Sequence, residues 1–190
     1  MSASPVPFLD AEAYLAIDRK AEWKSELHDG EMFPIEAVSV NHAAIDINVA
    51  AILKRRLTGT GCRAYGSPLR VQVSKSRYVY PDFQIVCGGV DVIDELEDTV
   101  TNPKVIIEIL SASTAGHDRG KKFQYYQKLP SLAEYVLISQ DQARVEVFTK
   151  HADEVWTLHI FDGRERTAKL ESIPIELPLI DLFDGIEFPA

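Results

Sequence analysis

The chain has 190 residues, of which 46% are hydrophobic, and a formal net charge of −9 at pH 7. This size and composition predict one globular domain spanning residues 1–190, and the lack of about eighteen consecutive apolar residues excludes a membrane-spanning helix. The N-terminal sequence MSASPVPFLD lacks the basic start and apolar run of a secretion signal, so we expect a soluble, cytoplasmic protein without a membrane partner.

Charge distribution and cysteine content narrow the possible partners. A negative total charge argues against broad nonspecific binding to nucleic acid, because Lys and Arg carry the affinity for phosphate. Residues 54–77 nevertheless contain seven basic residues and no acid, so one region of the surface could face phosphates, although a solvated helix end is the commoner explanation. Cys62 and Cys87 lack the spacing of a metal site, and we expect them to be free, buried thiols.

The N-terminal region is predicted to contain a helix followed by a hairpin. Apolar residues at helical spacing in residues 10–22 predict a short amphipathic helix, and Asp10 can cap its start. Asp29-Gly30 is typical of a tight turn between two short strands. The two acids that flank this turn, Glu26 and Glu31, are ordinarily surface charges in such a position.

The clearest predicted helix spans residues 39–57. Ser39 or Asn41 can cap its start, apolar residues recur along one face and Thr58-Gly59 ends it, so we expect this helix to pack across a sheet. His42 lies in the first turn, where capping or exposure to solvent is commoner than a chemical role. Hydrogen bonding near a functional site is the alternative for this residue.

Three strands are predicted next, over residues 62–66, 69–75 and 79–87. In the third strand, Asp82 follows Pro81, which has no amide proton to donate and therefore suits the start of a strand. Asp82 is thus a carboxylate at the beginning of a buried strand.

An acidic loop or short helix is expected over residues 90–102, before the apolar strand KVIIEIL at residues 104–110. Side chains alternate between the two faces of a strand, so Glu108 shares its face with apolar neighbours. An unpaired buried carboxylate is costly and calls for a cation, a basic partner or a metal. Asp82 on a neighbouring strand would complete the pair of carboxylates that a hard divalent cation prefers, and this arrangement suggests metal-assisted phosphodiester chemistry.

Residues 111–129 begin with several possible caps and predict a helix that starts near Asp118 and stops at Pro130. Asp118, Lys122 and Tyr126 follow one another at intervals of four residues, so one helix face presents an acid, an amine and a phenol. Such a group is ordinarily a weak helix ion pair beside aromatic side chains. The neighbouring carboxylates favour a functional role instead.

The C-terminal third is predicted to be a meander followed by a docked tail. Short polar links separate residues 134–139, 144–150 and 155–161, so we expect three antiparallel strands. Prolines in residues 173–186 allow at most one short helix, after Leu177, and the apolar side chains of this tail are expected to dock on the core or on a partner. The tail and the meander together predict a homodimer, because they offer more apolar edge than a monomer should expose.

Several pieces of the chain, in the same order, resemble the Uma2 family of restriction-endonuclease-like proteins, which is assigned to the PD-(D/E)XK nuclease superfamily. The resemblance runs from Glu22 to Phe183 and rests on SELHDGE, His42, YPDFQIV, VIIEILSAST, HDRGKKFQYYQKLPSLAEYVLI and ELPLIDLFDG. It implies an α/β fold in which a mixed, twisted β-sheet is flanked by helices in a single restriction-endonuclease-like domain.

The resemblance also implies roles for individual residues. The PD element corresponds to Pro81-Asp82, and the acid of the (D/E)XK element corresponds to Glu108. The usual lysine position, two residues further on, is Leu110 in this chain. In the family a lysine of the following helix takes its place, and that lysine corresponds to Lys122.

By the same resemblance, Glu26, or in second place Glu31, corresponds to an early acid that the N-terminal part donates in many superfamily members. The implied cofactor is Mg²⁺ or Mn²⁺, bound by Asp82, Glu108 and the main-chain carbonyl of Ile109. The predicted catalytic set is Asp82, Glu108, Lys122 and Glu26, and the predicted supporting residues are Glu31, His42, Asp118 and Tyr126.

Two functions from different classes follow from these residues. The first is a metal-dependent endonuclease that hydrolyses the phosphodiester bonds of DNA, and the joint presence of Asp82, Glu108 and Lys122 favours it. The second is a catalytically inactive nucleic-acid-binding or regulatory protein on the same scaffold, favoured by Leu110 and by the acidic net charge. The fold alone does not separate the two, because one fold supports many functions.

Overall fold

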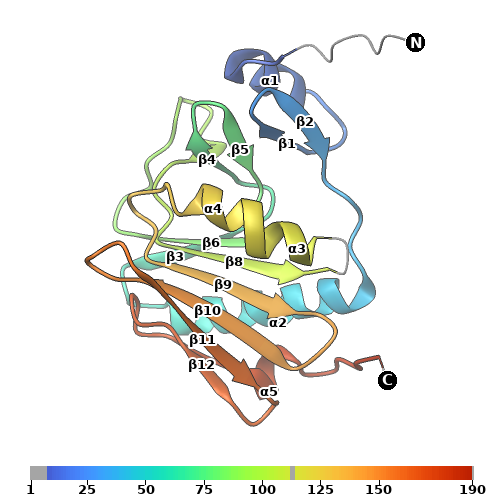
Figure 1. Cartoon of the computed structure of the whole chain (residues 1–190), viewed down its shortest axis with the longest axis vertical. Helices are drawn as coiled ribbons and strands as arrows, with labels where there is room; N and C mark the ends of the chain where they lie inside the picture. Colours follow the sequence, from blue (N-terminus) through green and yellow to red (C-terminus); the bar gives the residue numbers. More distant parts are fainter. Residues whose placement is uncertain (1–7, 112–113, 190) are drawn as a thin grey trace.

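The computed structural model describes residues 8–111 and 114–189, which form two main β-sheets and a small ribbon (Figure 1). The smaller sheet is built, in spatial order, from β2 (Glu31–Pro34), β1 (Ser25–His28), β5 (Arg77–Val79), β4 (Arg70–Ser74) and β7 (Thr99–Val100). The larger sheet is built from β11 (Trp156–Asp162), β10 (Arg144–Lys150), β9 (Glu134–Ser139), β8 (Val105–Leu110), β6 (Phe83–Cys87) and β3 (Cys62–Gly66).

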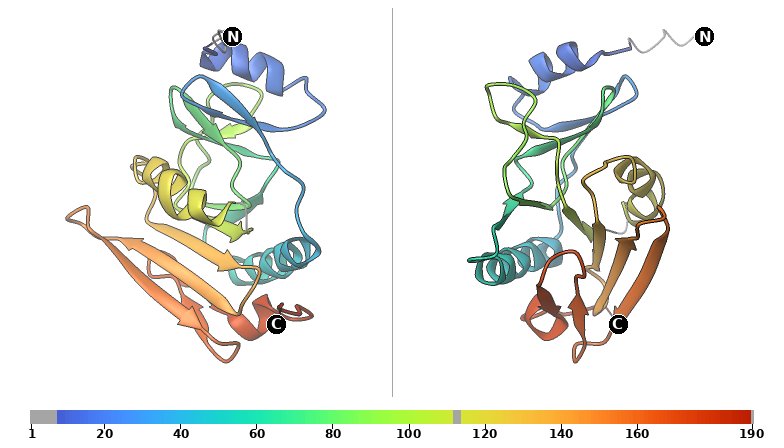
Figure 2. Two further views of the ribbon diagram at one scale, coloured as in Figure 1. Left: turned by 45° about the vertical axis from the view of Figure 1, so that its right-hand side comes forward. Right: turned by 90° about the vertical axis from the view of Figure 1, so that its left-hand side faces the viewer.

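Helices cover both faces of the larger sheet (Figure 2). One face is covered by α2 (Val40–Arg56); the other is covered by a segment made of α3 (Ala115–His117), the π-helical turn η1 (Asp118–Lys122) and α4 (Phe123–Tyr126). Helix α1 (Ala11–Asp18) packs on the smaller sheet. No helix in the described part of the chain has both the length and the apolar character needed to cross a bilayer.

The larger sheet is mixed, because β8 and β9 run parallel while its other neighbouring strands run antiparallel. Strand β8 is buried along its whole length, and its side chains alternate between two hydrophobic clusters. Ile107 packs on the α2 side, whereas Ile106 and Leu110 pack on the α4 side together with Tyr126. The predicted single-domain α/β fold with a mixed, twisted sheet is confirmed.

Several local predictions hold because they depend on residues close in sequence. Asp10 caps α1 by accepting a hydrogen bond of 2.8 Å from the Ala13 amide. Asp29 and Gly30 form the hairpin turn with positive φ angles of 50° and 93°, which glycine adopts without strain. Ser39 caps α2 as expected, and the three-stranded meander is present as β9, β10 and β11.

The prediction of one continuous strand over residues 79–87 is wrong. The chain leaves the smaller sheet at the end of β5 and enters the larger sheet at the start of β6, so residues 80–82 cross from one sheet to the other. Pro81 has no amide proton for a ladder hydrogen bond, and the Tyr80 amide donates at 2.9 Å to the Glu26 side chain instead. Asp82 therefore lies at the junction of the two sheets.

The long helix predicted after residue 111 is also different in the structure. Residues 112–113, which include some of the expected caps, lie outside the described residues. From Ala115 onward the chain forms one α-helical turn, the wider π-turn η1 and a second α-helical turn that ends at Tyr126. Turns of this wider kind are frequent at functional sites, and this one holds two of the predicted site residues, Asp118 and Lys122.

The expectation of free thiols is wrong, because Cys62 and Cys87 form a disulfide bond. They lie directly opposite each other in the antiparallel pair of β3 and β6, with their Cα atoms 3.9 Å apart. This pairing depends on the register of two strands and not on the spacing of the cysteines in sequence. Disulfides are typical of oxidising compartments and are rare in the cytosol. The cytoplasmic location stays a prediction.

The C-terminal tail docks on the protein's own core. Strand β13 (Glu176–Pro178) pairs with β12 (Thr167–Lys169), and the short helix α5 (Leu179–Leu182) follows Leu177 as predicted. The tail places Leu177, Leu179, Leu182, Phe183 and Ile186 in the hydrophobic cluster beneath α2. These side chains are therefore covered within one chain.

Candidate active site

Two carboxylates meet where the smaller sheet joins the larger one. Asp82 immediately precedes β6, and Glu108 lies on β8, the antiparallel neighbour of β6. The Ile109 amide donates a hydrogen bond of 2.6 Å to Oδ2 of Asp82, and the Asp82 amide lies 3.4 Å from Oε2 of Glu108. The two acidic residues are thus neighbours at the point where β6 begins beside β8.

Glu108 is almost completely buried, with 4% of its surface exposed. Its Oε1 atom accepts a hydrogen bond of 2.7 Å from the Tyr126 hydroxyl and lies 2.9 Å from Nζ of Lys122. Burial raises the pKa of Glu108 to about 8; the Lys122 ammonium opposes this rise, whereas the charges of Asp82 and Asp118 add to it. The protein therefore disfavours the ionised form of Glu108 when no additional cation is close.

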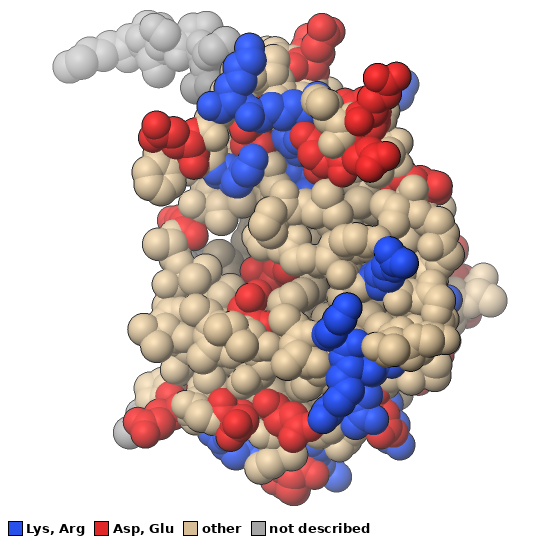
Figure 3. Space-filling model, turned by 180° about the vertical axis from the view of Figure 1, so that it is seen from behind, with Lys and Arg blue, Asp and Glu red and all other residues tan. Residues whose placement is uncertain are grey.

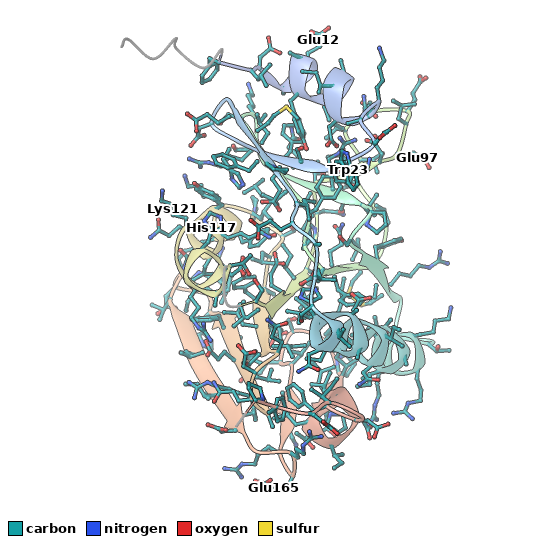
Figure 4. The ribbon with its side chains drawn as sticks, turned by 90° about the vertical axis from the view of Figure 1, so that its right-hand side faces the viewer. Glu12, Trp23, Glu97, His117, Lys121 and Glu165 are labelled. Atoms are coloured by element: carbon teal, nitrogen blue, oxygen red, sulfur yellow. A yellow bond between two sulfur atoms is a disulfide. The ribbon has the colours of Figure 1, made fainter. Side chains whose placement is uncertain are left out.

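Lys122 is buried among three carboxylates. In addition to its contact with Glu108, Nζ lies 3.3 Å from Oε1 of Glu26 and 4.0 Å from Oδ1 of Asp118. Burial alone would lower the pKa of Lys122, but these three acids raise it well above its usual value, so the amine stays protonated. The adjacent Lys121 is exposed and lies on the outer side of the helical segment (Figure 4).

Glu26 comes from β1 of the smaller sheet. Its Oε1 atom accepts the hydrogen bond from the Tyr80 amide, and its Oε2 atom lies 2.9 Å from Nε2 of His28. Burial would raise the pKa of Glu26, but the Lys122 ammonium, His28 and the Tyr80 amide together lower it to about 2. Glu26 is therefore an ionised carboxylate that joins the smaller sheet to the cluster.

Helix α2 contributes to the cluster from the opposite face of the sheet. His42, in its first turn, is buried and places Nε2 3.3 Å from Oδ1 of Asp82. Asp46 follows one helical turn later, and its pKa is raised first by burial and then by the charge of Asp82, against an opposing effect of His42. The N-terminal half of α2 therefore borders the Asp82 carboxylate.

Most of the residues predicted from the sequence come together in this cluster, and the residues that do so are Glu26, His42, Asp82, Glu108, Asp118, Lys122 and Tyr126. Glu31 does not join them, because it is exposed at the start of β2, where it lies opposite His28. Ile109 contributes its amide to Asp82, and a role for its carbonyl stays a prediction.

Two members of the cluster were missed by sequence reasoning. His28 lies two residues after Glu26 on the same strand, and Asp46 lies four residues after His42 on the same helix. Both spacings place the second residue on the same face as the first. This periodicity was the signal that could have identified them.

The residues at the junction fit a hard divalent cation. No group of three or more His, Cys, Asp or Glu side chains within residues 8–111 and 114–189 is arranged to hold a metal ion by itself. Mg²⁺ usually keeps several waters and needs only one or two protein carboxylates together with substrate phosphate. Asp82 and Glu108 supply such a pair, and Oε1 of Glu108, not Oε2, makes the contacts to Tyr126 and Lys122.

One face of the molecule combines acidic and basic regions (Figure 3). Acidic side chains are recessed near the middle of this face, and Lys and Arg side chains gather to one side of them. The face is the one that carries α2, which lies behind the larger sheet in Figure 1.

Comparisons with known proteins identify the family of the chain. The model of the Uma2 family, described as "Putative restriction endonuclease", matches residues 11–180. Two proteins of Synechocystis sp., both described as uncharacterized, are similar along most of the chain. The protein sll1609 is 35% identical over 83% of this chain and 90% of its own length, and slr1290 is 28% identical over 98% and 97%.

The fold is shared with a solved structure. A crystal structure from Anabaena variabilis, titled as that of "a putative nuclease belonging to DUF820", superposes with a TM-score of 0.78 and 19% sequence identity. The similarity covers 94% of this chain and 99% of that one. At this level of identity the comparison shows a common fold.

Proposed function

Because the chain belongs to the Uma2 family, we propose that it is a metal-dependent endonuclease that hydrolyses phosphodiester bonds of DNA. The observation that carries this proposal is the buried amine of Lys122 beside the carboxylates of Glu26 and Glu108, with Asp82 held next to Glu108. Two acids that can bind a metal ion, and an amine that can stabilise charge developing on a phosphate, are groups suited to phosphodiester hydrolysis.

Asp82 and Glu108 would hold Mg²⁺ or Mn²⁺ at this site, with DNA phosphate completing its ligands. When bound, the cation would supply Lewis acidity towards the scissile phosphate and the attacking water. In the reaction, water adds to phosphorus, the bond to the leaving oxygen breaks, and a proton from the water ends on that oxygen.

The protein's own side chains have distinct roles in this proposal. Lys122 stabilises the negative charge that develops on the phosphate in the transition state. Glu26 and Asp118 keep the ammonium of Lys122 charged and in place. Tyr126 fixes Glu108 through its hydrogen bond to Oε1, and His42 positions the Asp82 carboxylate.

Replacement of Lys122 tests this function against a matched control. Lys122→Met, which keeps the length of the apolar stem, is expected to lower the rate of plasmid cleavage about 10²-fold or more. Lys121→Met, at the adjacent exposed position, should keep most of the activity. Binding of Mn²⁺, measured by calorimetry, should persist in both variants because an ammonium does not ligate a cation.

Two outcomes would contradict the proposed role of Lys122. Equal loss of cleavage in both variants would mean that this helical segment contributes only diffuse positive charge. Full cleavage by Lys122→Met would make the lysine an ordinary ion-pair partner of the surrounding acids.

The alternative function is a nucleic-acid-binding or regulatory protein that does not cut. The observation that favours it is Leu110, which is buried in an apolar cluster at the position where related nucleases carry their lysine. Wild-type protein that binds DNA and Mn²⁺ but leaves plasmid intact would support this alternative.

We also propose a homodimer. The tail is buried in the protein's own core, so the surface that we assign to the dimer is the edge strand β11. Strand β11 is the outermost strand of the larger sheet and pairs only with β10 among the described residues. Leu158 and Ile160 on this strand are 43% and 47% exposed, and the strand contains no Lys or Arg. A free apolar edge of this kind is suited to pairing with a second copy of itself.

A further inference from the structure

A group of exposed basic side chains lies outside the active site, where α2 ends and the edge strand β3 begins. Lys54, Arg55 and Arg56 form the last turn of α2, and Arg63 lies on β3. All four are exposed. We call these four residues the basic patch; they come from the C-terminal end of α2 and from the neighbouring strand β3.

The charges of the basic patch are largely uncompensated. Among the described residues, Arg55 alone of the four has an ion-pair partner, Asp181 at 3.6 Å, and both side chains are well exposed. By contrast, Arg70 from the same basic stretch of sequence is buried against Asp18, and Arg77 pairs with Asp29. The structure therefore divides the basic stretch into side chains that hold the fold together and side chains that face solvent.

Compensation of the helix dipole explains part of this arrangement. Basic residues in the last turn of a helix interact favourably with its C-terminal carbonyls. Arg63 lies on a strand, however, and three consecutive basic residues exceed what one helix end requires. In a chain of net charge −9, a local excess of positive charge favours a polyanionic partner.

Helix α2 fixes the separation between the basic patch and the active site. His42, near the start of the helix, contacts Asp82 at 3.3 Å, and Lys54 follows His42 by twelve positions. At about 1.5 Å per residue, these positions are about 18 Å apart along the helix axis. Duplex DNA rises about 3.4 Å per base pair, so this distance corresponds to about five base pairs.

We propose that the basic patch binds the phosphate backbone of duplex DNA about five base pairs from the scissile phosphate. This inference rests on the proposed endonuclease function. In this arrangement α2 spans the distance between the cleaved position and the flanking contact, with His42 at one end and the basic patch at the other. The enzyme then requires duplex on that side of the cut, independent of base sequence.

The test compares two triple variants that carry the same change in charge. The patch variant is Lys54→Gln, Arg56→Gln and Arg63→Gln. The control variant is Lys20→Gln, Lys75→Gln and Lys128→Gln, three exposed lysines in other parts of the molecule. Affinity for a 24-base-pair duplex is measured by fluorescence anisotropy over a range of salt concentrations, with plasmid cleavage and melting temperature measured in parallel.

The patch variant should bind at least about tenfold more weakly than wild type, and the slope of log affinity against log salt should fall by about two to three. The control variant should keep the slope of wild type. Shortening the duplex to three base pairs beyond the cleaved position, on the side that contacts the patch, should weaken the affinity of wild type for the duplex. The same shortening should leave the affinity of the patch variant unchanged. Melting temperatures close to that of wild type show that the loss is one of contact and not of folding.

The outcomes separate this inference from the proposed function. If wild type cleaves DNA and the patch variant has the same affinity and salt slope as wild type, the proposed role of the basic patch is overturned. The proposed nuclease function is then unaffected. If both triple variants lose the same slope, binding depends on net charge and the inference is again overturned. If wild type neither binds nor cleaves DNA, the proposed function fails and the inference fails with it.

Discussion

At the scale of single residues, the main feature is a buried ammonium surrounded by an excess of acids. Lys122 offers one positive charge within 4.0 Å of Glu26, Glu108 and Asp118, and Asp82 lies beside Glu108. Burial of ionised groups is unfavourable unless each has a partner. Burial is the main cause of the raised pKa of Glu108, the charges of Asp82 and Asp118 add to it, and a bound divalent cation would favour the ionised form.

Neutralising either carboxylate of the proposed metal site tests this arrangement. Asp82→Asn and Glu108→Gln should each abolish binding of Mn²⁺ in calorimetry while the circular dichroism spectrum stays unchanged. Glu108→Gln should melt at or above the temperature of wild type in EDTA, because it replaces a carboxyl whose ionised form is disfavoured by burial with a neutral amide, while Lys122 keeps Glu26 and Asp118 as partners. Metal binding like that of wild type in both variants would show that the cation site lies elsewhere.

At the scale of secondary structure elements, strands β3 and β6 support the junction. Strand β6 begins directly after Asp82, and the disulfide between Cys62 and Cys87 ties its far end to the edge strand β3. Strand β8 holds its near end through the Ile109 amide. The strand that leads out of the active site is thus fastened at both ends.

The disulfide should contribute measurably to stability. Cys62 and Cys87 are 25 residues apart, and closing a loop of that length in the unfolded chain corresponds to roughly 3 to 4 kcal/mol. The double variant Cys62→Ser with Cys87→Ser should therefore lose about this free energy of unfolding in urea titrations. Reductant should lower the stability of wild type and leave the double variant unchanged. Two thiols that react with a thiol reagent in native, unreduced wild type would contradict the bond.

The predictions that hold and those that fail differ in the range of the interactions involved. The caps at Asp10 and Ser39 and the Asp29-Gly30 turn depend on neighbours within a few residues, so the sequence pattern sufficed. The break between β5 and β6 was missed because the Tyr80 amide bonds to a side chain 54 positions away. The disulfide was missed for the same reason, since it depends on strand register.

The candidate site was predictable for a related reason. Strand alternation alone placed Glu108 among apolar neighbours. Burying an unpaired carboxylate is costly, so a partner for Glu108 was expected nearby. Asp82 and Lys122 were then proposed from their positions in the sequence, the resemblance to a known family gave them roles, and the structure brings both to the same place. Glu31 was proposed by position alone, without any burial argument, and it is exposed.

At the scale of the whole molecule, the free edge of β11 is the feature that most affects assembly. The apolar tail, which the sequence left as a possible partner surface, is buried under α2. The edge of the larger sheet is therefore the surface on which the proposed dimer depends. Antiparallel pairing of two β11 strands would join the larger sheets of both copies.

A lysine on this edge should separate the two copies. Ile160→Lys introduces a buried charge at the proposed interface, whereas Ile180→Lys places the same change on α5, where the side chain is 57% exposed. Light scattering should give wild type and Ile180→Lys twice the monomer mass of 21.2 kDa, and Ile160→Lys the monomer mass. A wild-type mass of 21.2 kDa at micromolar concentration would refute the dimer.

The crossing of the chain between its two sheets has a consequence for the cell that makes it. The smaller sheet contributes Glu26 and the larger one contributes Glu108, so the complete cluster exists only when both sheets are docked. A nascent, damaged or partly unfolded chain lacks this docking and therefore lacks the complete cluster. If the proposed endonuclease function holds, this arrangement confines DNA cleavage to molecules that have finished folding.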